Sequence, residues 1–68
     1  MHDRDAMITE RAAAAYLGVS VAALRRWRRL GRPPAWARLG DKLVRYRVAD
    51  LERFVAANTR GDGQGEAA

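Results

Sequence analysis

The side chains with the clearest chemical potential are the basic ones between positions 25 and 47. This segment holds nine basic residues and one acid, a net charge of +8, whereas the whole 68-residue chain carries +5, so the remainder carries −3. Guanidinium groups bind phosphate oxygens and the O6 and N7 atoms of guanine through paired hydrogen bonds. The charge of this segment therefore predicts that it binds a polyanionic partner. Its cations are Arg25, Arg26, Arg28, Arg29, Arg32, Arg38, Lys42, Arg45 and Arg47.

The sequence lacks the residue combinations that usually carry out catalysis or bind metal ions. The single histidine is His2, there is no cysteine, and the acids are scattered singly. Ser20 is interpreted as a helix cap rather than a nucleophile. We therefore expect no enzyme activity, no cofactor, no metal and no small-molecule ligand. The N-terminal residues contain no apolar run for a signal peptide or membrane span, which predicts a cytoplasmic protein without a membrane partner. If its polyanionic partner is DNA, the protein is expected to be nucleoid-associated.

The elements that must position the arginines begin with two helices. Thr9 is a suitable N-cap for a helix over 10–17, and Gly18 is suited to end it. After a three-residue turn, Ser20 is placed to cap a second helix over 21–30, which Gly31 and the following prolines terminate. A helix, a short turn containing glycine and a second helix form a helix-turn-helix.

The second helix divides into two sides at about 100° per residue. The apolar side, expected to face the core, consists of Ala23, Leu24, Trp27 and Leu30. The opposite side consists of Val21, Ala22, Arg25, Arg26 and Arg29, with Arg28 at the edge. Stacking of Trp27 or Trp36 on bases is the alternative to core packing. For Trp27 we favour the core, and for Trp36 packing beside the prolines.

The remainder of the chain predicts a hairpin and a third helix. Strand-like pieces at 36–39 and 43–47 flank Gly40 and Asp41, with Val44 and Tyr46 on the core side. From Asp50 onward, a stripe of Leu51, Phe54 and Val55 indicates a helix. The predicted fold is mainly α with a small β-hairpin, a winged helix-turn-helix of three helices plus a wing. We expect a flexible N-terminus at 1–7, the domain at 8–57 and a disordered tail at 58–68.

In this order, several segments resemble the excisionase-type, MerR-like winged helix-turn-helix family. They are ITERAAAAYLGVS at 8–20, LRRW at 24–27, LG at 30–31, RLG at 38–40, VRYR at 44–47 and DL at 50–51. The resemblance covers residues 8–57. It implies that the second helix enters the major groove of double-stranded DNA and that the wing reaches phosphates or the adjacent minor groove.

The resemblance, together with the positions of the basic residues, predicts which residues contact DNA. On the recognition helix these are Ser20, Val21, Ala22, Arg25, Arg26 and Arg29. On the wing and flanks they are Arg28, Arg32, Arg38, Lys42, Arg45 and Arg47. Arg28 and Arg32 have the alternative of an ion pair with an acid such as Glu10 or Glu52, and Arg47 that of a structural role beside the third helix.

Within this family, excisionases are also called recombination directionality factors. We expect such a factor, which binds tandem sites, self-associates cooperatively side by side on DNA, bends it and promotes excision by an integrase. The sequence shows no dimerisation coiled coil and no effector domain after the third helix, which argues against a ligand-sensing MerR regulator. The alternatives are a compact MerR- or AlpA-like transcriptional regulator, and an adaptor that uses its basic surface to bind an acidic protein.

Overall fold

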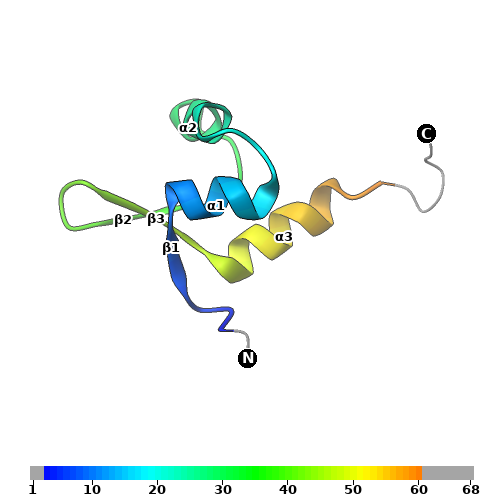
Figure 1. Cartoon of the computed structure of the whole chain (residues 1–68), viewed down its shortest axis with the longest axis horizontal. Coiled ribbons are helices and arrows are strands. Elements are labelled where there is room, and N and C mark those ends of the chain that lie inside the picture. The colour runs from blue at the N-terminus through cyan, green and yellow to red at the C-terminus, as the bar shows by residue number, and fades with distance from the viewer. Residues whose placement is uncertain (1–2, 61–68) are drawn as a thin grey trace.

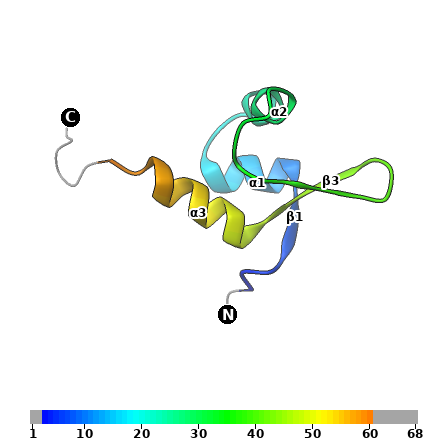
Figure 2. The same ribbon diagram turned by 180° about the vertical axis from the view of Figure 1, so that it is seen from behind.

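The computed structural model describes residues 3–60, which form three helices and three short strands. Along the chain these are β1 (Met7–Thr9), α1 (Glu10–Leu17), α2 (Val21–Arg29), β2 (Ala37–Leu39), β3 (Leu43–Arg47) and α3 (Val48–Asn58). Figure 1 shows α1 near the centre of the molecule, with α2 on one side of it and α3 beside it. The loop between β2 and β3 projects away from the helices, as the reverse view also shows (Figure 2).

The first two helices are bounded by the caps that the sequence predicts. The hydroxyl oxygens of Thr9 and Ser20 each accept a hydrogen bond from the backbone N–H three residues later, both at 3.0 Å. Gly18 closes α1 with a φ of 73°, a left-handed conformation in which a side chain would be strained. These local interactions fix the turn between α1 and α2.

The three strands form one antiparallel sheet in the order β1-β3-β2. Met7 lies opposite Arg47 in the first pair, and Leu39 lies opposite Leu43 in the second. With the hairpin of β2 and β3 following the two helices, the predicted winged helix-turn-helix arrangement is confirmed. We call residues 37–47, including the loop at 40–42, the wing.

The sequence does not predict strand β1, and residues 1–7 are expected to lie outside the domain. The structure corrects this boundary, because Met7 belongs to the sheet. The chain before Met7 is also bonded to the start of α3. The backbone N–H of Val48 donates to the carbonyl of Ala6 at 3.0 Å, and that of Ala49 donates to the carbonyl of Arg4 at 2.8 Å.

A small core lies between α1, α2, α3 and the sheet. Its buried members are Ala13, Ala14, Leu24, Tyr46 and Leu51. The small alanines let α2 and α3 approach α1 closely, while Tyr46 supplies the largest buried side chain. Trp27 packs beside Phe54 with ring centroids 5.8 Å apart, so its predicted position on the core side is confirmed.

Several sequence predictions fail at the ends of elements. Helix α2 ends at Arg29 rather than residue 30, and Leu30 is 54% exposed instead of packing in the core. Val21, expected on the outer side, packs partly against the core. Both errors arise because ideal helical angles do not apply where a helix begins or ends.

The third helix also differs in detail. It begins at Val48, two residues before the expected start, and Val55 from the predicted stripe is exposed. Asn58 is still helical, so the tail expected at 58–68 overlaps the end of α3. The remainder of that expectation, from residue 61 onward, lies outside the described residues.

Candidate nucleic-acid interface

The outer side of α2 presents long cationic side chains and a small residue near its start. Arg25, Arg26, Arg29 and Ala22 are exposed, as is Arg32 after the helix. Ser20, by contrast, uses its hydroxyl oxygen to cap the helix. Because Ala22 is small, a surface as large as a nucleic acid can approach the first turn of α2 closely.

The wing presents its basic residues on two different faces. In β3, Tyr46 and Val44 point toward the helices, so the alternating residues Leu43, Arg45 and Arg47 point to the opposite face. Arg38 pairs with Val44 across the hairpin and therefore shares the helix-facing side. Of the wing cations, the structure thus places Arg38 on the side of α2, and Arg45 and Arg47 on the other.

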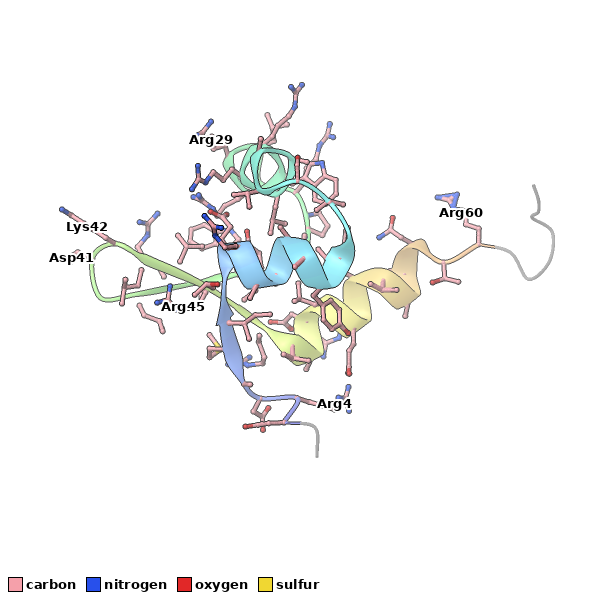
Figure 3. All side chains as sticks on the ribbon, viewed as in Figure 1. Arg4, Arg29, Asp41, Lys42, Arg45 and Arg60 are labelled. Carbon is pink, nitrogen blue, oxygen red and sulfur yellow. The ribbon has the colours of Figure 1, made fainter. Side chains whose placement is uncertain are left out.

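Lys42 extends from the loop at the tip of the wing, and Arg29 projects outward from α2 (Figure 3). Arg4 lies instead near the N-terminal end, and Arg60 beyond α3. Arg4 is held at a distance of 2.6 Å by Glu52, on α3. The exposed cations of α2 and of the wing tip are therefore separate from those near the termini.

Glu10 connects three elements through its carboxylate, and we call Glu10, Arg25, Arg28 and Tyr46 the Glu10 cluster. Nε and Nη2 of Arg28 donate to Oε2 and Oε1 of Glu10 at 2.9 and 3.3 Å. Nε of Arg25 donates to Oε1 at 3.2 Å, and the Tyr46 hydroxyl donates to Oε2 at 3.2 Å. The cluster joins the first residue of α1 to α2 and to the central strand.

The ionisation of the cluster follows from these bonds. Burial raises the pKa of Glu10, but hydrogen bonds from Arg28, Arg25 and Tyr46 outweigh burial and hold this pKa below its ordinary value of 4.5. Burial, followed by the charge of Glu10, raises the pKa of Tyr46 to about 12. Near neutral pH the cluster therefore contains one carboxylate, two guanidinium groups and a neutral phenol.

Trp36 provides a second link between α2 and the wing. The guanidinium carbon of Arg28 lies 5.4 Å from the centroid of the indole, and that of Arg38 lies 5.3 Å from it. Both distances allow a cation–π interaction. Arg38 also donates to the carbonyl of Asp41 at 3.4 Å, which holds it along the loop.

Comparison with protein families adds the decisive observation. The family model described as a helix-turn-helix domain matches residues 7–59, more than half of the chain. The chain belongs to this helix-turn-helix family. It is accordingly a DNA-binding protein. No curated protein and no solved structure matches it.

Helix-turn-helix domains place the second helix of the motif in the major groove. In this domain that helix is α2, whose exposed cations are Arg25, Arg26 and Arg29. Val21 is half-buried, and Arg28 is held by Glu10 with only 18% of its side chain exposed. The ion pair between Arg28 and an acid, which the sequence left open as an alternative, is therefore present.

Sequence reasoning missed the role of Glu10 toward Arg25. A carboxylate at the first turn of a helix is an ordinary dipole partner, and Glu10 lies 15 residues from Arg25. The only available signal was that Glu10 is the one acid between Thr9 and Asp41. An acid alone in such a basic stretch is a candidate partner for several cations.

Within residues 3–60, no group of three or more His, Cys, Asp or Glu side chains could hold a metal ion. None of the helices described is long and apolar enough to cross a membrane.

Proposed function

We propose that this helix-turn-helix protein is an excisionase, also called a recombination directionality factor. In this proposal several copies bind neighbouring sites in double-stranded DNA and associate side by side. Together they bend the DNA and help an integrase assemble the complex that excises a mobile element. The family match supports DNA binding, and the order of sequence segments described above supports the excisionase type.

The observation that carries the proposal is the separation of exposed cations onto two elements. Arg26 and Arg29 extend from α2, and Lys42 extends from the wing tip. A protein with two such elements can contact the duplex in the major groove and again along the backbone. Neutralising phosphates over such a stretch provides affinity and lowers the cost of bending the duplex toward the protein.

The test uses the full chain and DNA that flanks its own gene. We expect a footprint of several direct sites next to a recombination core, together with a measurable bend. We also expect the protein to increase excision by a neighbouring integrase in a reconstituted reaction. A single protected site over a promoter, with no effect on excision, would identify the compact transcriptional regulator instead.

Matched variants test whether the exposed arginines of α2 are needed for DNA binding. The double substitution Arg26→Ala/Arg29→Ala should abolish the footprint, because both side chains are exposed on α2. Arg53→Ala is the control, since Arg53 is an exposed arginine of α3 that pairs with Asp50 in its own helix. Negligible binding of the unmodified protein to any duplex at low salt would overturn the proposal and favour the adaptor with an acidic protein partner.

A further inference from the structure

Glu10 holds two arginines of α2 through different atoms. Arg28 uses both Nε and Nη2 on one carboxylate, and its side chain is 18% exposed. Arg25 uses Nε alone, and its side chain is 54% exposed. Arg28 is therefore part-buried and held through two of its nitrogens, whereas Arg25 is attached at one atom and otherwise exposed.

The attachment through Nε leaves a defined set of donors on Arg25. Its Nη1 and Nη2 atoms have no hydrogen-bond partner among residues 3–60. These two nitrogens form the end edge of the planar guanidinium and carry parallel N–H groups. In the major groove, O6 and N7 of guanine accept such a pair of hydrogen bonds.

We propose that Glu10 is a specificity-determining residue, which clamps Arg25 through Nε and presents its Nη1 and Nη2 pair to a guanine. This inference rests on the proposed placement of α2 in the major groove. Glu10 does not contact DNA itself and acts as a positioning residue for Arg25. The ligand of the pair is the major-groove edge of a G·C base pair.

The clamp is rigid because other residues hold the carboxylate. Glu10 is 12% exposed and accepts hydrogen bonds from Arg28 and Tyr46 in addition to that from Arg25. A guanidinium restrained before binding loses less conformational freedom when it meets a base. A carboxylate beside Arg25 also repels phosphates, so it disfavours arrangements in which this arginine contacts only the backbone.

The experiment compares base discrimination with general affinity. The full chain selects a preferred duplex from a random pool, and each G·C pair in it is then replaced by A·T. We expect Arg25→Ala to remove discrimination at one G·C pair. Glu10→Gln should reduce the discrimination there by about threefold or more, out of the roughly 5- to 150-fold that one bidentate contact provides. Affinity for a mixed-sequence duplex should remain equal or increase.

Three further variants separate positioning from charge and from stability. Glu52→Gln removes the same charge from an acid that pairs with Arg4, and it should leave discrimination unchanged. Glu10→Asp keeps the charge but withdraws the carboxylate by one methylene, so it should lower discrimination as Glu10→Gln does. Glu10→Gln combined with Arg25→Ala should match Arg25→Ala alone. All affinities are measured below the unfolding transition of every variant, followed by circular dichroism.

The other outcomes overturn the inference in distinguishable ways. Equal weakening of both duplexes by the Glu10 variants would mean that Glu10 only supports the fold. Unchanged discrimination in those variants would show that Glu10 does not position Arg25 for base contact. If Arg25→Ala weakens all sequences equally, Arg25 contacts phosphate and the inference fails while the interface stands. If Arg25→Ala affects no duplex, the proposed placement of α2 fails as well.

Discussion

The two basic elements of this protein, α2 and the wing, are held in place in contrasting ways. Helix α2 lies on the core through Leu24, which is fully buried, and through Trp27. The wing projects beyond that core, and the facing residues Leu39 and Leu43 are 42% and 52% exposed. The helix is therefore fixed by packing with the rest of the domain, whereas the outer part of the wing depends on its own hairpin.

The hydrogen bonds made by the arginines of the two elements show the same contrast. On α2, Arg25 and Arg28 are bonded to a carboxylate from another helix. On the wing, Arg38 and Arg45 donate to main-chain carbonyls of the wing itself, those of Asp41 and Val44. A side chain fixed by a distant element can read a base reproducibly, while a side chain on a projecting hairpin suits backbone contacts. We therefore expect α2 to set the position of the protein on the bases and the wing to neutralise phosphates.

The largest expected effect compares how much core packing stabilises α2 and how much it stabilises the wing. Leu24→Ala should cost about 2–5 kcal/mol of unfolding free energy, because it leaves a cavity under α2. Leu43→Ala should cost under about 1 kcal/mol, since this leucine is largely exposed on the wing. Urea unfolding followed by circular dichroism measures both. Similar losses in the two variants would contradict the contrast between a supported helix and a projecting wing.

The next effect concerns DNA contact by α2. Arg26→Ala should weaken binding to the preferred duplex by about 1–3 kcal/mol if Arg26 contacts a base, with a smaller loss on a scrambled duplex. Arg26 is exposed on the outer side of α2, so the substitution should leave stability nearly unchanged. Fluorescence anisotropy at fixed salt measures both affinities. Equal losses on the two duplexes would restrict Arg26 to phosphate contact.

The structural features of the domain differ in how far the sequence predicts them. The caps at Thr9 and Ser20 and the burial of Leu24 were predictable, because they depend on neighbouring residues and helical period. Strand β1 was not, since three residues carry too little periodicity and their partners in β3 lie 36 to 40 residues further along the chain. The Glu10 cluster was only partly predictable, because a long-range ion pair leaves no local pattern.

Acid conditions should remove the stabilisation that the Glu10 carboxylate gives to α2. The pKa of Glu10 is lowered in the folded state, so its contribution to stability is present above about pH 4.5 and is lost as pH falls through the lower folded value. Glu10→Gln should cost about 1–2 kcal/mol at neutral pH, because hydrogen bonds to a charged group are strengthened. The difference from the unmodified protein should shrink below pH 4.5. A difference that stays constant from pH 7 to pH 3 would place the stabilisation elsewhere.

The smallest expected effect concerns Lys42 at the tip of the wing. Lys42 is exposed on the loop, where a cation can neutralise a phosphate without a defined base partner. Lys42→Ala should weaken binding to the preferred and scrambled duplexes alike, and reduce the slope of log K against log salt by about 0.9. Asp41→Asn, which removes the adjacent negative charge, should strengthen binding to both. Because Arg38 bonds the main-chain carbonyl of Asp41, this substitution leaves that contact in place. If the slope stays the same after Lys42→Ala, the wing tip does not contact the backbone, and neutralisation must come from the cations on α2.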